Sequence, residues 1–316
     1  MEKIIDLAYQ VGPLLYMPAD QVNIIDKIKN KSIKDLRSVA FCLEDTIEEG
    51  YLEEAEKKLL FIISSLKDVN DLPFIFIRVR TPQHLLKIHQ MFKDYESIIT
   101  GYILPKFDLS NCDAYIDIIN KDLPKDIYIM PILESYDIAD CAHRRDTLFI
   151  IKERINSISN RILNVRVGCN DLCNIFGVRR NSQQTIYDIH LVKDALIDIL
   201  NVFSSEYVVS GPVYDYFDGG NNSNWAVTFN KEIELDISNG FIGKTCIHPT
   251  QLSYVIEKLK VNRIDYEDAL SILKWNDAKR IVAKSVDGGR LNEVKCHTKW
   301  ALKIAKLGAI YGIKDE

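Results

Sequence analysis

The sequence predicts an α/β protein of the (β/α)8 TIM-barrel class, with additional helices at its C-terminal end. Eight short apolar runs alternate with longer amphipathic stretches, and no long linker or change in composition interrupts them. The first run ends in Pro18-Ala19-Asp20, without the glycine-rich phosphate turn that typically opens a doubly wound sheet. We therefore prefer a closed barrel to the open doubly wound sheet, which is the alternative.

Each expected strand is a short apolar run, and each expected helix has apolar residues at three- and four-residue spacing. The expected strands cover residues 14–18, 38–43, 74–79, 101–104, 127–133, 162–167, 207–210 and 242–247. The clearest helical patterns cover residues 19–30, 52–66, 82–92, 111–120, 172–176, 186–203 and 249–259.

Residues 1–262 are expected to form the catalytic barrel, and residues 263–316 a helical extension. In the extension we expect two helices, over 265–285 and 291–310, joined by Asp287-Gly288-Gly289. A barrel closes without them, so we expect them to pack on its rim or on a neighbouring subunit. The glycine- and asparagine-rich residues 218–224 follow the seventh strand and predict a solvated loop, with a mobile lid as the alternative.

Composition excludes several classes of function. The chain has 40 basic and 45 acidic residues, so it lacks the basic excess typical of nucleic-acid binding, and we expect a small-molecule partner. Its seven cysteines show no metal-binding or redox spacing and are expected to be reduced packing residues. The N-terminal stretch carries charges throughout and no apolar run reaches membrane-spanning length, so we expect a cytoplasmic protein that does not bind membranes.

Charged or polar side chains end five consecutive expected strands. One such residue alone is usually a solvated boundary residue, but the carboxyl ends of barrel strands meet at one mouth, where barrel enzymes have their active sites. The sequence therefore predicts a site at this mouth. The residues are Glu44-Asp45, Arg78 with Arg80, Lys106, Glu134 and Asn170-Asp171.

Glu134 and Asp171 lie at the ends of neighbouring expected strands. Two carboxylates suit octahedral Mg²⁺, which takes its other ligands from water and substrate. The alternative for Glu134 is an ion pair with Lys106 or Arg78. A nearby arginine matches a carboxylate with two parallel hydrogen bonds. Metal and arginine together predict a site for an α-keto or α-hydroxy acid.

Several segments occur together in a recognisable order. They are LLYMPAD, FCLEDT, IRVR, GYILPK, PILES, GCNDL and GKTCIHPTQL. In order and approximate spacing they resemble the HpcH/HpaI aldolase and citrate lyase β-subunit (CitE-like) family over nearly the whole chain. The segments GCNDL, FGVRRN, TIYD and SGPVYDYF resemble most the branch of C–C bond lyases of the TIM-barrel fold found near tellurite-resistance-type genes. The resemblance implies Mg²⁺-dependent cleavage or formation of a carbon–carbon bond next to a carbonyl, often on acyl-CoA substrates.

The resemblance also implies roles for individual residues. Glu134 and Asp171 correspond to the metal ligands, and Arg78 to the arginine that holds a substrate carboxylate or enolate oxygen. Glu44 and Asp45 correspond to the acidic pair beside it. Asp45 is our candidate for the base that takes the substrate hydroxyl proton, with the orientation of Arg78 as its alternative role.

The remaining charged residues of these segments have less direct roles. Lys106 is expected to be a charge partner, and with Arg78 and Arg80 it completes the substrate-binding set. His248 is expected to bond to backbone in a strand-to-helix turn. Arg179-Arg180 predicts a solvated basic turn, with a phosphate or second-carboxylate site as the alternative.

The chain departs from the family pattern at several positions. Gly12-Pro13 and Ala19 stand where the family opens with an arginine and a glycine, which leaves the use of CoA open. Arg80 replaces the usual asparagine, and Asn170 the usual glutamate. Because of these departures, one alternative function stays open. It is a barrel that binds a metabolite or a partner protein without turnover.

We therefore expect a Mg²⁺-dependent lyase or aldolase that acts on an anionic keto or hydroxy acid through a metal-stabilised enolate. Mn²⁺ is the alternative metal, and a homotrimer or homohexamer is the expected assembly. A CoA-thioester lyase of the citrate lyase β-subunit or malyl-CoA lyase type is the alternative function within the same fold.

Overall fold

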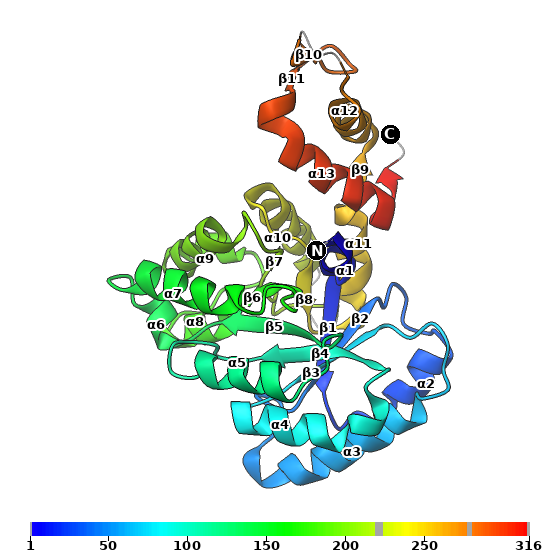
Figure 1. Ribbon diagram of the computed structural model, residues 1–316, viewed down its shortest axis with the longest axis vertical. Coiled ribbons are helices and arrows are strands. Elements are labelled where there is room, and N and C mark those ends of the chain that lie inside the picture. Colours follow the sequence, from blue (N-terminus) through cyan, green and yellow to red (C-terminus); the bar gives the residue numbers. More distant parts are fainter. Residues whose placement is uncertain (1, 219–223, 277–279, 315–316) are drawn as a thin grey trace. The chain divides into compact units, whose positions relative to one another are not determined.

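The computed structural model describes residues 2–218, 224–276 and 280–314, and these form two compact units, residues 1–255 and 256–316 (Figure 1). The assignment of residues 1–262 to catalysis and of 263–316 to packing on the rim or on another subunit stays a prediction.

Eight parallel strands form the centre of the first unit, in the order β7-β6-β5-β4-β3-β2-β1-β8. A parallel bridge between Gly211 and Lys244 joins the two ends of this order, and the Ile242 amide donates to the Val209 carbonyl at 2.9 Å. The sheet is therefore closed, and the predicted (β/α)8 barrel is confirmed. The strands are β1 (Pro13–Pro18), β2 (Ser38–Cys42), β3 (Phe74–Arg78), β4 (Ile99–Leu104), β5 (Tyr128–Leu133), β6 (Val165–Val167), β7 (Val209–Ser210) and β8 (Lys244–Cys246).

A glycine allows β8 to meet β1. Gly243 has φ +76°, and a Cβ built there would lie 2.4 Å from the Gly12 carbonyl oxygen. Only a residue without a side chain combines this left-handed conformation with so close a backbone approach. The barrel therefore closes at a position that tolerates no larger residue.

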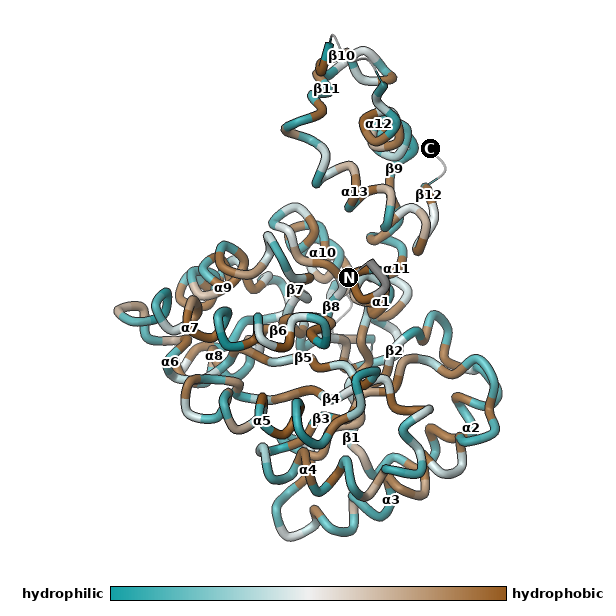
Figure 2. The backbone as a smooth tube through the Cα atoms, viewed as in Figure 1, coloured by the Kyte–Doolittle hydropathy of each residue, from teal (hydrophilic) through white to brown (hydrophobic). Residues whose placement is uncertain are grey.

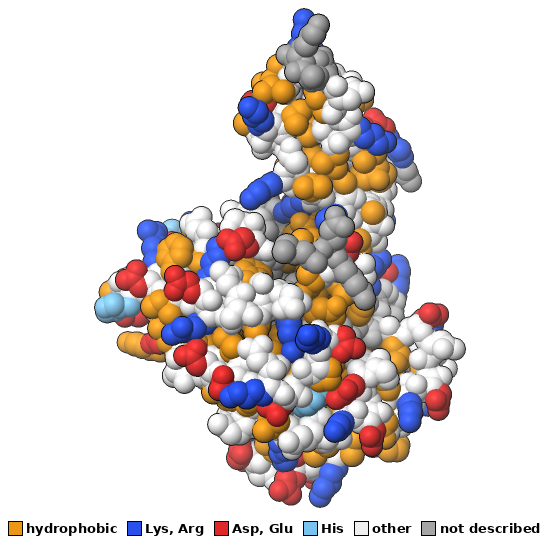
Figure 3. All heavy atoms as spheres, viewed as in Figure 1, with side chains coloured by type: hydrophobic (Ala, Val, Ile, Leu, Met, Phe, Trp, Pro, Cys, Tyr) orange, Lys and Arg blue, Asp and Glu red, His pale blue; other side chains and the backbone are white. Residues whose placement is uncertain are grey.

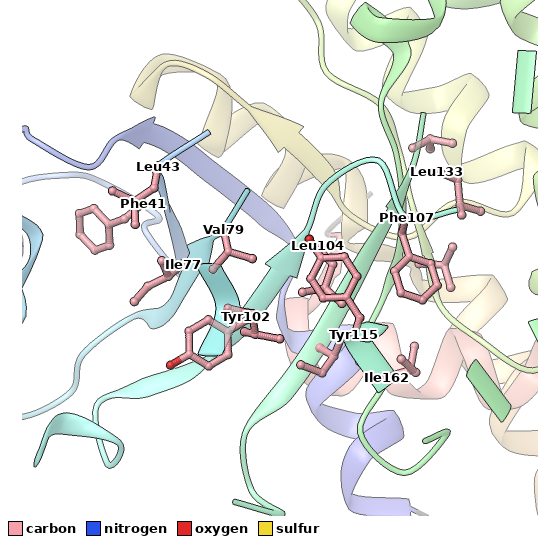
Figure 4. Packing of buried hydrophobic residues seen from close by; sticks show 14 of the residues in the cluster. Phe41, Leu43, Ile77, Val79, Tyr102, Leu104, Phe107, Tyr115, Leu133 and Ile162 are labelled. Atoms are coloured by element: carbon pink, nitrogen blue, oxygen red, sulfur yellow. The ribbon is translucent and has the colours of Figure 1, made fainter. Parts of the chain in front are cut away.

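Helices surround the strands, and the outer core lies between the two layers. Figure 4 shows Phe41, Leu43, Ile77, Val79 and Tyr102 packed in this layer, where side chains alternate with those that point into the barrel. The helices are α2 (Ile24–Lys29), α3 (Leu52–Ser65), α4 (Pro82–Met91), α5 (Cys112–Lys121), α6 (Tyr136–Ala139), α7 (Arg144–Asn156), α8 (Cys169–Ile175), α9 (His190–Phe203), α10 (Trp225–Asn239) and α11 (Leu252–Leu259), with short 3-10 turns η1 (Glu49–Tyr51), η2 (Lys93–Tyr95), η3 (Ile186–Asp188) and η4 (Pro249–Gln251).

Helix α1 (Glu2–Gln10) precedes the first strand and was not predicted. The Asn164 side chain, just before β6, donates to the Ala8 carbonyl at 3.1 Å, and the Ser38 hydroxyl, at the start of β2, donates to the Val11 carbonyl at 2.7 Å. These contacts place the end of α1 at the amino ends of the strands, opposite the mouth where the candidate site was predicted.

The second unit contains α12 (Arg263–Leu273) and α13 (Val294–Tyr311), and Ala269, Ile272 and Ala301 form its small core. Strand β9 (Val261–Asn262) pairs in parallel with β12 (Ile313–Lys314). The predicted helix 265–285 is wrong beyond Leu273, because β10 (Val282–Lys284) pairs with β11 (Leu291–Glu293) as an antiparallel hairpin.

The hairpin depends on contacts that are distant in sequence. Buried Asp268 of α12 accepts hydrogen bonds from the Val286 amide at 2.8 Å, Asn292 at 2.9 Å and Arg290 at 2.6 Å. Gly288, at φ +74°, forms the tight turn. The predicted helix therefore does not extend over residues 282–285, because a single buried carboxylate organises this segment.

Within the described residues no helix is long and apolar enough to cross a bilayer. Five cysteines are buried as predicted, but Cys141 and Cys296 are exposed and so are not packing residues.

On the face of the barrel unit in Figure 3, acidic and basic side chains are interspersed, and Figure 2 shows the hydrophobic residues concentrated along the strands. The predicted loop or lid over 218–224 falls mostly on residues 219–223, which lie outside the described residues.

Candidate active site

Arg78 is the centre of a group of charged side chains at the carboxyl ends of the strands. Its Nη2 atom lies 2.8 Å from Glu44 Oε2, 3.1 Å from Asp45 Oδ2 and 3.1 Å from Glu134 Oε1. These residues come from the ends of β2, β3 and β5, so the parallel barrel brings together side chains that are up to 90 residues apart in sequence, as the positions of Glu44 and Glu134 show. The guanidinium is buried, and one nitrogen contacts three carboxylates.

Lys106 joins the same group from the end of β4. Its Nζ lies 2.6 Å from Glu44 Oε1, 3.3 Å from Asp45 Oδ1 and 3.9 Å from Asp171 Oδ1. Its backbone amide donates to Glu134 Oε1 at 3.0 Å. The residue has φ +46°, a conformation that a non-glycine residue adopts at a cost of about 1 kcal/mol or more. This conformation lets the backbone and the side chain of one residue contact different carboxylates.

The pKa values of the carboxyls differ because their surroundings differ. Burial raises the pKa of Glu134 to about 7, against the opposing effect of Arg78 and with a further increase from Asp171. Burial also raises the pKa of Glu44. At half-exposed Asp45, burial raises the pKa, but the hydrogen bond with Glu44 and the charges of Arg78 and Lys106 outweigh it and lower the pKa. Asp45 is therefore ionised at neutral pH.

Glu134 and Asp171 have the donor chemistry of a Mg²⁺ site. The Glu134 carboxylate lies against Gly168, where an added Cβ would be 1.7 Å from Oε2, so only glycine leaves room for it. Asp171 lies in the first turn of α8 and is partly exposed. In the described part of the chain no three His, Cys, Asp or Glu side chains are grouped to hold a metal. Two carboxylates with water and substrate oxygens fit Mg²⁺, which takes one or two carboxylates from protein.

Glu134 forms an ion pair in the structure, and its role as a metal ligand stays a prediction. Arg78 forms the ion pair that was the alternative to metal binding, and the contact from Lys106 comes from its backbone amide rather than its ammonium. All these contacts are made to Oε1, whereas Oε2 faces Gly168. The ion pair with Arg78 and the bond from the Lys106 amide therefore both use Oε1 rather than Oε2.

Arg80, predicted to bind substrate, contacts a loop instead. Its Nε donates to the Leu43 carbonyl at 2.7 Å, and its other nitrogens bond to the Ile47 carbonyl and to Glu49. These contacts hold the segment between β2 and α3. Arg80 also donates to the Glu44 carbonyl at 3.4 Å, so it contacts the group around Arg78 only through backbone.

Arg180 is not part of a solvated turn. It is 2% exposed and bonds Glu232 at 2.6 Å and Asp215 at 3.2 Å. Glu232 also accepts from the Lys244 ammonium at 2.8 Å. The prediction of a solvated turn is wrong for Arg180, because α10 supplies a buried carboxylate that local sequence does not reveal.

His248 behaves as predicted. Its Nδ1 accepts from the Thr250 amide at 3.3 Å and so caps the turn η4. The imidazole also stacks on Phe217 with ring centres 4.5 Å apart.

Arg166 of β6 was missed as a functional candidate because it lies between valines in an apolar run. Alternation along the strand was the available signal, since it places Arg166 on the opposite face from Val165 and Val167. The side chain is 1% exposed inside the barrel.

The comparisons with known proteins agree with this architecture. The profile of a family described as C-C bond lyase of the TIM-barrel fold matches residues 5–313. The protein CitE from Mycobacterium tuberculosis, in complex with magnesium, acetoacetate and coenzyme A, is 17% identical with a TM-score of 0.62, covering 95% of this chain and 99% of that chain. The M. tuberculosis citrate lyase β subunit with oxaloacetate and magnesium is 17% identical with a TM-score of 0.53, covering 79% and 98%. RipC from Yersinia pestis is 14% identical with a TM-score of 0.55, covering 79% and 95%. No curated protein matches the sequence. At such identities the structural likeness shows the fold.

Proposed function

The chain belongs to the C–C bond lyases of the TIM-barrel fold, and from this we propose that it cleaves or forms a carbon–carbon bond in an anionic keto or hydroxy acid, with Mg²⁺ as its cofactor and Mn²⁺ as a substitute. The observation that carries the proposal is the position of two carboxylates at one mouth of the barrel: Glu134 lies 3.1 Å from Arg78, and Asp171 lies 3.9 Å from Lys106 of the same group. Neighbouring structures with magnesium and oxaloacetate, or with magnesium and pyruvate, support the choice of ligands.

Glu134 and Asp171 would hold the metal. Bound Mg²⁺ would supply Lewis-acid polarisation of the substrate keto oxygen. Arg78 provides a fixed positive charge where negative charge develops as the bond breaks. Its Nε is buried and has no hydrogen-bond partner among the described residues, so one donor remains for a substrate oxygen.

Asp45 is the proposed base. It is ionised, 46% exposed and next to both Arg78 and Lys106. In the cleavage direction its carboxylate takes the proton of the substrate hydroxyl, which becomes a carbonyl. The electron pair of the breaking carbon–carbon bond passes into the enolate, which Arg78 stabilises. Orientation of Arg78 is the other role that the 3.1 Å contact permits.

A CoA thioester is the second candidate substrate, because the CitE structure that holds coenzyme A matches over 95% of this chain. Thermal protection by CoA or a short acyl-CoA is expected if this is correct, since a bound ligand stabilises the folded state. Absence of protection across several acyl-CoAs would leave the free acid as substrate. A homotrimer or homohexamer stays our expectation for the assembly.

The first test is calorimetric titration of Mg²⁺ into metal-free protein, with and without oxaloacetate or pyruvate. We expect binding that the keto acid tightens and that Asp171→Asn and Glu134→Gln each abolish. Asp117→Asn, on the exposed face of α5, is the matched control and should bind normally. Normal Mg²⁺ binding by Asp171→Asn would contradict the assignment.

Enolate formation can be tested without knowing the full substrate. We expect Mg²⁺-dependent exchange of the pyruvate methyl protons for deuterium, followed by NMR, and its loss in Asp171→Asn. Metal and keto-acid binding without any exchange would favour the alternative of a barrel that binds a metabolite without turnover.

A further inference from the structure

Arg166 crosses the interior of the barrel. Its Nη2 donates to Thr245 Oγ1 on β8 at 2.7 Å, and its guanidinium carbon lies 5.9 Å from the centre of the Tyr16 ring on β1. The sheet neighbours of β6 are β5 and β7. A side chain on β6 therefore reaches β8 and β1 only through the interior.

The positive charge of Arg166 has no carboxylate partner among the described residues. Its other hydrogen bond, to Asn164 Oδ1, is long at 3.4 Å. Burial lowers the pKa of Arg166, whereas at Arg78 the effect of burial is outweighed by Glu134 and other neighbours, which raise the pKa. A buried charge without an ion-pair partner is strongly unfavourable, so an anion from outside the chain would stabilise Arg166.

The other buried cations of the described chain are compensated. Arg78, Arg144, Arg180 and Lys244 each contact at least one carboxylate. Arg161 lacks a carboxylate but donates to several backbone carbonyls, among them those of Ile119, Leu123, Pro124 and Ile127. Arg166, whose partners Asn164, Thr245 and Tyr16 are all neutral side chains, is the exception in this set.

Two buried donors, one of them in the guanidinium itself, have no hydrogen-bond partner among the described residues. They are Arg166 Nε and the hydroxyl of Ser210. Arg166 and Ser210 are paired in the register of β6 and β7, so both side chains lie on the inner face of the sheet. Buried polar groups are nearly always hydrogen-bonded in folded proteins, and a guanidinium beside a hydroxyl suits a carboxylate.

Arg166 and Ser210 lie one layer further inside the barrel than the proposed metal ligands Glu134 and Asp171. Arg166 precedes Gly168, which contacts Glu134, by two residues, or about 7 Å along the strand. Its partner across β5 is Ile132, two residues before Glu134. Tyr16 and Thr245, the residues that the guanidinium reaches, are partly exposed, whereas Arg166 and Ser210 are each 1% exposed.

We propose that Arg166 and Ser210 form an anion subsite that binds the second carboxylate of a short dicarboxylic keto or hydroxy acid, whose keto end lies at Glu134 and Asp171. The proposal rests on the proposed function and names its substrate class. It differs from the role of Arg78, because Arg78 already contacts three carboxylates of the protein.

The test compares oxaloacetate, with two carboxylates, and pyruvate, with one, by calorimetry in the presence of Mg²⁺. We expect the wild type to bind oxaloacetate about 10- to 100-fold more tightly. Arg166→Met should remove this preference and leave the affinities for pyruvate and Mg²⁺ unchanged. Arg154→Met, at a half-exposed arginine of α7, is the matched control and should keep the preference.

A second readout separates ligand binding from a structural role. Ligand-free Arg166→Met should unfold at a higher temperature than the wild type, because the substitution removes an unpaired buried charge. A structural arginine would give a lower unfolding temperature. Retention of the oxaloacetate preference in Arg166→Met, or its absence in the wild type, overturns the proposal.

Two further measurements, on Ser210→Ala and with succinate, test the subsite if Arg166→Met does not fold or if Mg²⁺ does not bind. If Arg166→Met does not fold, Ser210→Ala should still weaken the preference about 3- to 10-fold, and full retention would overturn the proposal. Succinate is tested on metal-free protein. If it protects the wild type but not Ser210→Ala, while Mg²⁺ does not bind, the subsite stands and the proposed function fails.

Discussion

Replacing Glu134 by glutamine is expected to stabilise the metal-free protein above pH 7. Glu134 is 3% exposed, and burial raises its pKa to about 7 from an ordinary value of 4.5. Between these two pH values the unfolded chain loses the proton while the folded protein keeps it. The free energy of unfolding of the wild type therefore falls as pH rises through this interval, and the contribution of Glu134 levels off above it.

The size of the stability difference follows from the interval between the two pKa values of Glu134, 4.5 and about 7. At about 1.4 kcal/mol per pH unit, burial of the ionised carboxylate lowers stability by about 3 kcal/mol at pH 8. Glutamine keeps an acceptor for Arg78, but it exchanges a charged hydrogen bond for a neutral one, which offsets about 1 kcal/mol of the gain. We therefore expect Glu134→Gln to exceed the wild type by about 2 kcal/mol at pH 8 and by close to zero at pH 5.

Urea unfolding in EDTA from pH 5 to 8.5 measures this difference, and subtracting the two proteins cancels the titration of other groups. Glu153→Gln, at an exposed glutamate of α7, is the control and should differ from the wild type by an amount independent of pH. Mg²⁺ at pH 8 should raise the urea midpoint of unfolding of the wild type but not that of Glu134→Gln. A difference that does not change with pH, or a less stable Glu134→Gln at pH 8, would refute the reasoning.

Three further substitutions test the same contacts. Arg78→Met should destabilise the protein by about 3–5 kcal/mol in urea unfolding, because Glu134 loses its buried cation; a loss below about 1 kcal/mol would contradict this. Lys244→Met should cost a similar amount, since Glu232 and Asp236 remain buried, whereas Lys121→Met at an exposed i,i+4 pair should cost less than about 0.5 kcal/mol. Gly168→Ala should weaken Mg²⁺ binding at least about 10-fold in calorimetry, because the new methyl group occupies the position of the Glu134 carboxylate, and unchanged affinity would show that Glu134 is not a ligand.

The candidate site could be predicted from the sequence because strand ends are local features. An apolar run followed by a charged residue is visible in the printed chain, and parallel strands place successive ends at the same mouth. This reasoning predicts Glu134, Asp171 and Arg78 at one mouth, and the structure places Glu134 3.1 Å from Arg78 and Asp171 3.9 Å from Lys106. The same reasoning placed Arg80 there, and the structure shows it bonded to the Leu43 carbonyl instead.

Other features depend on partners that are distant in sequence. Arg180 is next to Arg179 in a polar stretch, and only Glu232, 52 residues away, makes it a buried residue. Residues 282–284 were predicted as the end of a helix over 265–285, but they form a strand, and Asp268 and the turn at Gly288 organise this segment. Lys106 likewise has a left-handed backbone, φ +46°, and contacts carboxylates that are distant in sequence.

By itself, the sequence predicted the alternation of strands and helices along the barrel, favoured a closed barrel over an open sheet, and indicated the mouth at which charged residues meet, because period and strand-end chemistry are properties of short segments. Only the tertiary structure decided which of these charges are paired. Arg78 and Arg166 both lie in short apolar runs, yet Arg78 contacts three carboxylates, whereas no described carboxylate pairs with Arg166. Pairing depends on distances across the barrel, and those distances exist only once the eight strands have closed.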